Sequence, residues 1–214
     1  MPRVFGHQNG VRAVKKIVEE ANKHEIEYLT LFTFSIENWD RPSDEVDTLM
    51  KLLVQTLREE FEDIFNNNIK LNAIGDLSSL PNKVKEELNS IIENTKNNTG
   101  MTLTLALSYG GKQEIFKAVK EISEKVKNDI IFLDNFDDSV INDHLYTRNL
   151  PDVDLLIRTS GEQRISNFLL WQIAYAELYF TDVYWPDFTE KDFTKAIIEY
   201  QNRERRFGKT SKQL

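Results

Sequence analysis

The chain has 214 residues, of which 35 are acidic and 27 basic, giving a formal net charge of −8, and it contains no cysteine. Without cysteine these residues cannot form a disulfide, a thiolate nucleophile or a thiolate-ligated metal site. The acidic balance lacks the basic footprint of a nucleic-acid-binding protein, although a compact arginine cluster can still bind phosphate. No apolar run approaches the roughly 20 residues of a membrane span, and residues 1–7 have no signal-peptide core, so a cytoplasmic protein is expected.

The first half of the chain is predicted to alternate helices and strands. Apolar side chains three or four positions apart predict a helix over residues 8–23. Residues 28–34 are apolar on both faces, which is typical of a strand buried between helices. A long helix is predicted over residues 43–61, with Ser43 as its cap. A short strand over residues 69–74 and a charged helix over residues 82–94 follow.

The second half continues this alternation. Residues 101–107 alternate leucine and threonine and predict another strand. Gly110 and Gly111 then lead into a helix, and by themselves they do not establish a phosphate site. The further predicted elements are a helix over residues 113–126, strands over 153–157 and 177–180, and a helix over 192–206 whose basic end suits the helix dipole. Residues 134–149 have the least defined pattern.

This order of elements predicts the fold class. Strands that alternate with helices form βαβ units, so we expect a single α/β domain with a mostly parallel central sheet flanked by helices. Ligands bind such sheets beyond the carboxyl ends of the strands. Polar clusters follow three predicted strands, at residues 35–41, 108–111 and 158–166. These three loops are expected to converge on one site.

The cluster at residues 158–166 contains Arg158, Arg164 and Ser166 around a glycine. A guanidinium group is a planar fork of donors that suits phosphate oxygens, and hydroxyl and loop N–H groups can add to it. The alternative is a solvated turn with ordinary ion pairs. Because several donors occur together, we predict an anion site.

Glu177 lies in an otherwise apolar and aromatic segment, where a carboxylate is costly unless it is paired. A Mg²⁺ ion shared with substrate phosphates is one possible partner, because this ion usually takes only one or two protein carboxylates. A salt bridge to an arginine is the other. The residues alone favour neither.

Other polar side chains allow two interpretations each. Arg3 and His7 precede the first predicted helix and could meet a diphosphate there, or His7 could be an ordinary surface residue. Trp39 either packs in a turn or belongs to a mobile loop over a substrate. His24 and His144 show no partner pattern and are expected to be structural.

Apolar side chains in two predicted elements suit either a core or a hydrophobic tunnel, and composition does not separate the two. These side chains are Leu49, Leu52, Leu53, Met101 and Leu103.

Taken together, the motifs resemble the cis-prenyltransferase family, and specifically bacterial undecaprenyl diphosphate synthases. The matching segments are residues 3–7, 34–42, 108–111, 154–188 and 203–208. The run over residues 157–172 is the most specific, and the resemblance covers essentially the whole chain. It implies an α/β fold with a hydrophobic tunnel, and condensation of isopentenyl diphosphate with an allylic diphosphate such as farnesyl diphosphate. The product would be a long cis-polyprenyl diphosphate, the precursor of a lipid carrier for cell-wall synthesis.

The resemblance also implies roles for individual residues. Arg158, Arg164 and Ser166 would hold the diphosphate of isopentenyl diphosphate, and Glu177 would help to bind Mg²⁺. The side chains that would face the allylic substrate or organise both substrates are Arg3, His7, Ser35, Glu37, Asn38, Trp39 and Arg41, with Ser35 and Asn38 as catalytic residues. The tunnel would be lined by Leu49, Leu52, Leu53, Met101 and Leu103, with Met101 at a position that influences product length.

The chain departs from the family pattern in two places. The family opens with a strand and the motif Met-Asp-Gly-Asn-Gly-Arg-Trp, whose aspartate is the principal catalytic and metal-linked residue, and this motif is absent. We therefore expect residues 1–214 to be an N-terminally truncated domain with lost or impaired activity, and a sheet that lacks a central strand. Gln163 stands where many relatives have histidine, so a proton or metal role of that position is in doubt.

Two other functions compete with this interpretation. A non-catalytic subunit of a heteromeric prenyltransferase would explain the missing motif, but it has no need of the arginine cluster. A trans-type prenyl synthase is all-helical with paired aspartate-rich motifs, and the acidic run at residues 134–138 echoes these only superficially.

The expected partners are the two diphosphate substrates and a second copy of the chain. The homodimer follows from the resemblance, and residues 171–185 could supply its apolar interface. A long lipid product implies transient contact with the inner membrane surface. No nucleic acid partner is expected.

Overall fold

The computed structural model describes residues 3–208, and the side chains from residue 10 onward. The chain forms two compact units. The central unit comprises residues 21–151 and 167–171, and the terminal unit comprises the residues up to 20, residues 152–166 and those from 172 onward. Both contain parallel strands and helices, which confirms the predicted α/β class. The prediction of one domain over residues 1–214 concerns how the units associate and stays a prediction.

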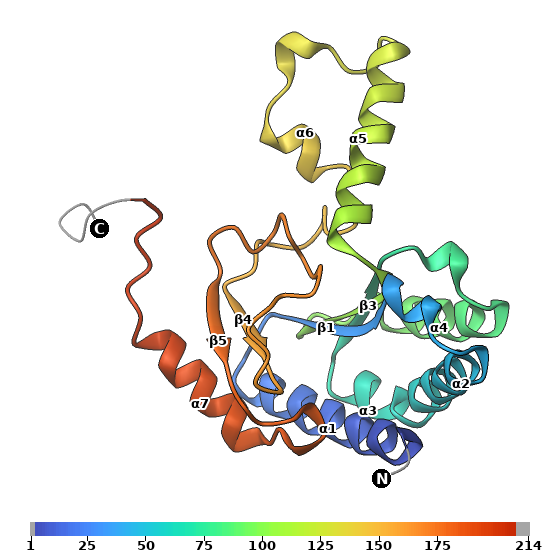
Figure 1. Cartoon of the computed structure of the whole chain (residues 1–214), viewed down its shortest axis with the longest axis vertical. Coiled ribbons are helices and arrows are strands. Elements are labelled where there is room, and N and C mark those ends of the chain that lie inside the picture. Colours follow the sequence, from blue (N-terminus) through green and yellow to red (C-terminus); the bar gives the residue numbers. More distant parts are fainter. Residues whose placement is uncertain (1–2, 209–214) are drawn as a thin grey trace. The chain divides into compact units, whose positions relative to one another are not determined.

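The central unit is built on a three-stranded parallel sheet in the order β1-β3-β2 (Figure 1). Its strands are β1 (Tyr28–Ser35), β2 (Lys70–Ile74) and β3 (Thr102–Tyr109). Seven of the eight residues of the middle strand β3 are buried, as its apolar sequence predicts. In the register, Ser35 stands opposite Tyr109, so β1 and β3 end at the same edge of the sheet.

Strand β1 is less buried than its sequence predicts. Phe34 is its one buried residue, whereas Leu31 and Phe32 are only half-buried and Tyr28 is exposed. The reason is that, within residues 3–208, β1 has β3 as its single ladder partner. A second partner on its free edge would be needed to bury a strand that is apolar on both faces.

Helices α2 (Ser43–Glu59), α3 (Phe61–Asn66) and α4 (Asn82–Thr95) belong to the same unit. The buried face of α2 consists of Val46, Met50, Val54 and Leu57, at the expected spacing. The single helix predicted over residues 43–61 is broken at Glu60, which separates α2 from α3. Ser43 is the first helical residue rather than the cap, because Pro42 takes the cap position.

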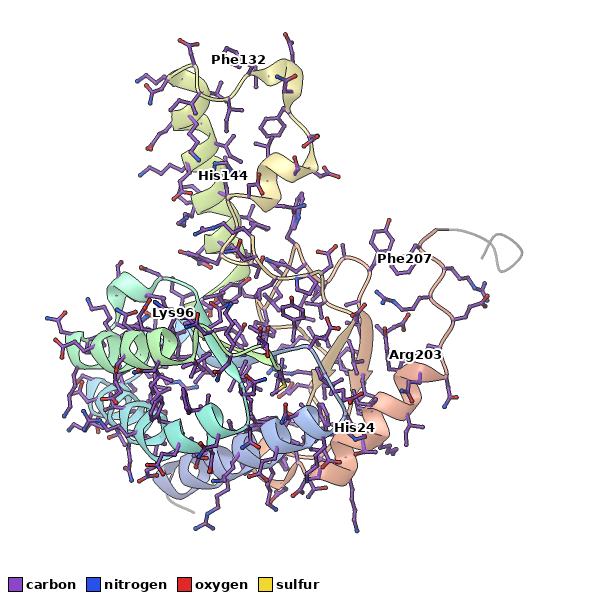
Figure 2. All side chains as sticks on the ribbon, turned by 180° about the vertical axis from the view of Figure 1, so that it is seen from behind. His24, Lys96, Phe132, His144, Arg203 and Phe207 are labelled. Atoms are coloured by element: carbon purple, nitrogen blue, oxygen red, sulfur yellow. The ribbon has the colours of Figure 1, made fainter. Side chains whose placement is uncertain are left out.

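The segment after β3 forms an arm that extends away from the carboxyl end of that strand (Figure 1). We call residues 111–143 the α5–α6 arm, with α5 (Gly111–Lys127) and α6 (Asp138–Asn142) as its two limbs. His144 joins the two limbs of the arm part-way along its length, as its ring contacts Val140 O at 2.6 Å and Lys125 Nζ at 2.7 Å (Figure 2). This supports the expected structural role of His144.

The terminal unit contains a two-stranded parallel sheet of β4 (Leu155–Arg158) and β5 (Glu177–Phe180). Helix α1 (Arg3–Lys23) contributes its first residues to this unit, and α7 (Glu190–Gln201) packs there with Phe193 and Ala196 buried. Trp185 Nε1 donates to Gly10 O at 3.2 Å, which joins the β5–α7 connection to α1.

Both helices of the terminal unit differ from their predicted bounds. Helix α1 begins at Arg3, so Arg3 and His7 lie within the helix rather than before it. Helix α7 ends at Gln201, so its last turn has no basic residue and the arginines at 203, 205 and 206 follow the helix. The expected match of these charges to the helix dipole is therefore wrong. Among the residues described, no helix is both long and apolar enough to cross a membrane.

Candidate functional site

The loop after β4 places Arg158 at the end of a parallel strand, as predicted. Arg158 is half-buried, and its Nε is fully buried with no hydrogen-bond partner among the described residues. A buried donor without a partner costs about 1–3 kcal/mol, so a small movement of this guanidinium that lets it meet an acceptor would be favourable. This feature fits the predicted anion site.

Two N–H groups of the same loop are already engaged within the protein. Ser160 N donates to Val183 O at 2.8 Å, and Gly161 N donates to Thr181 O at 2.9 Å. Ser160 and Gly161 both have positive φ, 72° and 67°, which turns these N–H groups toward the segment after β5. These two N–H groups therefore do not contribute donors to an anion.

Arg164 and Ser166 lie on the surface of the terminal unit. Arg164 forms an ion pair with Glu162, two residues before it. This pair is the ordinary surface contact that we considered as the alternative, and it does not prevent Arg164 from exchanging Glu162 for a phosphate. Ser166 has φ 50°, in the left-handed region.

Glu177 takes the salt-bridge alternative in this structure. Arg203 Nη1 donates to Glu177 Oε2 at 3.0 Å and to Leu178 O at 2.9 Å, while its Nη2 donates to Glu199 Oε1 at 2.6 Å. These carboxylates raise the pKa of Arg203, with Glu199 the larger influence. Arg203 therefore faces β5 instead of ending α7, as Figure 2 shows.

Arg205 is the second arginine after α7 that folds back on the unit. It forms an ion pair with Asp154, next to β4, and its guanidinium carbon lies 4.6 Å from the centre of the Phe207 ring. Its Nε is buried without a partner among the described residues. Sequence reasoning treated these arginines only as a helix end, although their match to the family motif at residues 203–208 was a usable signal.

The cluster at residues 35–41 forms a short 3-10 helix, η1 (Ile36–Asp40), at the end of β1. Asn38 Oδ1 accepts from Ser35 N at 3.0 Å, in a reciprocal cap of the kind that fixes helix starts. The two residues predicted to be catalytic thus hold each other in place. Arg41 pairs with Glu45 at 2.9 Å, at the start of α2.

Trp39 follows the packed interpretation. Its Nε1 donates to Ser108 Oγ at 2.9 Å, and its ring packs edge-on against Phe34 with centroids 5.0 Å apart. Ser79 also donates to Ser108 Oγ, at 2.9 Å. Ser108 is buried with φ 48°, a strained conformation for serine that the surrounding contacts hold.

Asn167 is a site residue that sequence reasoning missed. Its Nδ2 donates to Glu37 Oε1 at 2.8 Å and to Gln113 Oε1 at 3.0 Å. Its Oδ1 accepts from Lys112 N at 2.8 Å and its backbone oxygen from Gly111 N at 2.7 Å. Asn167 therefore joins η1 to the first turn of α5. It follows the predicted Arg158–Ser166 cluster directly, and this was the available signal.

Gly110 and Gly111 have a steric role in this arrangement. A Cβ on Gly110 would lie 2.7 Å from Asn167 Nδ2 and 2.9 Å from Ile36 Cγ2, and one on Gly111 would lie 2.8 Å from Leu170 Cγ. The glycine pair lets the turn at residues 167–170 pack directly on the start of α5. The N–H groups of Gly111 and Lys112 donate to Asn167.

The first turn of α5 also carries a buried carboxylate, Glu114. Glu114 is 1% exposed, and it accepts from Tyr109 OH at 2.5 Å and from Tyr146 N at 2.7 Å. Burial, followed by the charge of Glu114, raises the pKa of Tyr109. Burial likewise raises the pKa of Tyr146 to about 12, with contributions from Asp76 and Glu114. Both tyrosines therefore stay neutral, and the cluster ties the base of the arm to β3.

The predicted tunnel residues divide into two groups. Met101 and Leu103 are each 3% exposed and belong to the core. Leu49, Leu52 and Leu53 are half-buried beside the buried stripe of α2, so each has accessible apolar surface. The tunnel itself stays a prediction.

The clusters at residues 35–41 and 108–111 meet in the central unit, as the hydrogen bond between Trp39 and Ser108 shows. The cluster at residues 158–166 belongs to the terminal unit, so its convergence with the other two stays a prediction. Arg3 and His7 lie in α1, but their side chains are outside the described set. From residue 10 to residue 208 no group of three or more carboxylates or histidines is placed to hold a metal ion.

Three comparisons bear on identity. Residues 1–208 match the family model described as "Putative undecaprenyl diphosphate synthase". An isoprenyl transferase of Clostridium perfringens is 49% identical over 208 residues, which cover 97% of this chain and 82% of that protein. A farnesyl-diphosphate-specific undecaprenyl diphosphate synthase of Pasteurella multocida is 52% identical over 206 residues, which cover 96% of this chain and 86% of that protein.

Two solved structures are also similar. Lavandulyl diphosphate synthase of Lavandula x intermedia, in complex with dimethylallyl diphosphate, has a TM-score of 0.93 at 37% identity, covering 96% of this chain and 89% of that one. A probable undecaprenyl diphosphate synthase of Campylobacter jejuni has a TM-score of 0.82 at 39% identity, covering 94% of this chain and 93% of that one.

Proposed function

Because the chain belongs to the undecaprenyl diphosphate synthase family of cis-prenyltransferases, we propose that it condenses isopentenyl diphosphate with an allylic diphosphate such as farnesyl diphosphate. The product is a long cis-polyprenyl diphosphate, a lipid-carrier precursor for cell-wall synthesis. The observation that carries this proposal is the buried, unpartnered Nε of Arg158 at the end of β4.

Arg158 binds the diphosphate of isopentenyl diphosphate in this proposal. A phosphate oxygen would satisfy the guanidinium donor, and charge-assisted bonds of this kind are among the strongest in proteins. Arg164 and Ser166, both exposed in the same loop, supply further donors once Arg164 leaves Glu162. On the other substrate, Arg3 and His7 face the allylic diphosphate.

Glu177 is the carboxylate that we propose for Mg²⁺. A single carboxylate suffices in principle, because Mg²⁺ at phosphate sites takes most of its ligands from phosphates and water. When bound, the ion neutralises negative charge that develops on a leaving diphosphate. Arg203 occupies Glu177 Oε2, so this arginine and the ion would compete for the same carboxylate.

The reaction forms one carbon–carbon bond and breaks one carbon–oxygen bond. The C1–O bond of the allylic substrate breaks with its electrons going to diphosphate, and the alkene electrons of isopentenyl diphosphate form the new bond to C1. A proton then passes from the isopentenyl unit to a carboxylate or phosphate oxygen. The arginine side chains stabilise the charge on the diphosphates, and holding the two carbons together supplies proximity.

The apolar chain that grows in this reaction needs shelter from water. The half-buried leucines of α2, at positions 49, 52 and 53, have accessible apolar surface, and we propose that they line the tunnel together with Met101 and Leu103. Each CH₂ group buried there contributes about 0.8 kcal/mol. Release of such a product implies transient contact of a cytoplasmic protein with the inner membrane surface.

A homodimer is the assembly that we propose, with the α5–α6 arm as its surface. Six large apolar side chains on the arm are exposed, with Phe116 72% and Phe132 60% exposed; the others are Val119, Ile130, Leu133 and Phe136. The α5 limb carries five lysines and three glutamates, whereas residues 129–143 carry five aspartates and no lysine or arginine. Opposite charges on the two limbs make the arm self-complementary, as a two-fold interface requires.

The substrate assignment is tested by Arg158→Ala and by isothermal titration with isopentenyl diphosphate. We expect affinity to fall by at least about tenfold, since hydrogen bonds to charged groups contribute roughly 1.5–3 kcal/mol. Arg148→Ala, an arginine of the central unit outside the predicted site, is the matched control. Unchanged affinity in a folded Arg158→Ala variant would remove the assignment.

A further inference from the structure

We propose that Asn167 is a positioning residue that fixes Glu37 on the first turn of α5. The role of Glu37 as a substrate-binding group rests on the proposed function. The contact between Asn167 and Glu37 is independent of the proposed function, because both side chains belong to the central unit.

All polar atoms of the Asn167 side chain are engaged. The two Nδ2 hydrogens have acceptors in Glu37 Oε1 at 2.8 Å and Gln113 Oε1 at 3.0 Å, and Oδ1 accepts from Lys112 N at 2.8 Å. An amide is the one side-chain type of this size that can donate twice and accept at the same time. Aspartate would accept only, and serine is too short to reach both segments.

The backbone around Asn167 is arranged for these contacts. Its φ is 63°, a left-handed conformation that asparagine tolerates better than most residues. The missing Cβ atoms of Gly110 and Gly111 leave the space that its side chain and the following turn occupy. Phe168 anchors that turn, since its ring stacks on Phe32 of β1 with centroids 4.4 Å apart. Asn167 is therefore held between two rigid elements.

Glu37 depends on this neighbour for its orientation. It is exposed and lies in η1, where its carboxylate also accepts hydrogen bonds from the Ser35 hydroxyl and from its own backbone N–H, so Asn167 supplies the one restraint from outside this segment that lowers its pKa through a hydrogen bond. Partial burial raises its pKa, but the hydrogen bond from Asn167 is the largest of several effects that bring the pKa below its ordinary value. The other effects that lower the pKa of Glu37 are hydrogen bonds from its own backbone N–H and from the Ser35 hydroxyl, and the positive charge of Lys112.

The sharpest test is Asn167→Asp. Aspartate keeps an acceptor for Lys112 N, so α5 remains capped, but it replaces the donor to Glu37 with a second negative charge. Nuclear magnetic resonance titration of the Glu37 carboxyl, assigned by its loss in Glu37→Gln, should show a raised pKa. Asn167→Gly removes the whole side chain without straining a positive φ, and it should also raise that pKa. Gln113→Leu is the matched control, because it removes the other acceptor and leaves Glu37 bonded.

Enzyme kinetics then distinguish a positioning role of Asn167 from a role in stability alone. In a double-mutant cycle on kcat/KM, Asn167→Gly should reduce the value about tenfold in the wild-type background and less than twofold when Glu37 is already alanine. Multiplicative effects, or an unchanged Glu37 pKa in both Asn167 variants, would overturn the proposal. If residues 1–214 bind isopentenyl diphosphate but transfer no prenyl group, as the sequence leads us to expect, the pKa of Glu37 alone decides the positioning role; if they also fail to bind it, the proposed function fails while the pKa test still stands.

Discussion

Glu177 and Arg203 form an ion pair in which Arg203 Nη1 lies 3.0 Å from Glu177 Oε2, so the proposed metal ligand is already paired with a cation. Both side chains are partly exposed, and such pairs contribute only about 0.2–1 kcal/mol. A pair this weak can be exchanged for a metal ion without a large loss of stability.

Replacing Arg203 should therefore strengthen Mg²⁺ binding. In Arg203→Met the competing cation is gone, so the apparent Mg²⁺ affinity, measured by calorimetry with inorganic pyrophosphate present, should rise by up to about fivefold. Arg206→Met is the control, since Arg206 pairs with the surface residue Glu204. An unchanged or weaker affinity in a folded Arg203→Met variant would show that Glu177 is not the metal ligand.

The arm variants test the proposed homodimer. Phe132→Asp and Phe116→Asp place a charge in the exposed apolar surface of the α5–α6 arm, and each should weaken the dimer by at least about thirtyfold, the effect of losing an interface hot spot. Light scattering after gel filtration gives the mass directly. Phe65→Asp is the control, because Phe65 is a similarly exposed phenylalanine on α3, outside the arm. A monomeric wild type, or arm variants that remain dimeric, would contradict the assignment.

Stability should fall at alkaline pH because of the tyrosines around Glu114. The pKa of Tyr146 is raised to about 12 in the folded protein, above its ordinary value near 10. Between these values the unfolded chain loses a proton that the folded protein keeps, so the contribution is fully present below pH 10 and is lost as pH rises toward 12. Denaturant unfolding from pH 9 to pH 12 should show this decline.

Tyr146→Phe gives the matched comparison for that decline. Tyr146 contacts Glu114 through its backbone N–H, so the substitution removes the titrating hydroxyl and keeps this hydrogen bond. The variant should lose less stability over the alkaline range than the wild type. A decline of equal steepness in both proteins would assign the effect to other groups.

The sequence alone predicted the strands well, because each follows from a local apolar pattern. The predicted runs at residues 69–74, 101–107 and 177–180 coincide with β2, β3 and β5 to within a residue or two. Helix ends were less predictable. The apolar pattern continues through Glu60 without a proline or glycine to mark the break between α2 and α3. Likewise, the arginines after Gln201 read as a helix end, whereas Arg203 pairs with Glu177, 26 residues away in the sequence.

The family and the positions of its polar clusters were determined by the sequence, because motifs at residues 34–42, 108–111 and 154–188 are contiguous in the chain. Only the tertiary structure showed which partners Trp39, Glu177 and Gly111 contact. It also revealed Asn167, 130 residues away from Glu37 along the chain. The physical reason is that a polar side chain has several possible partners in sequence, and packing alone brings one of them within hydrogen-bond distance.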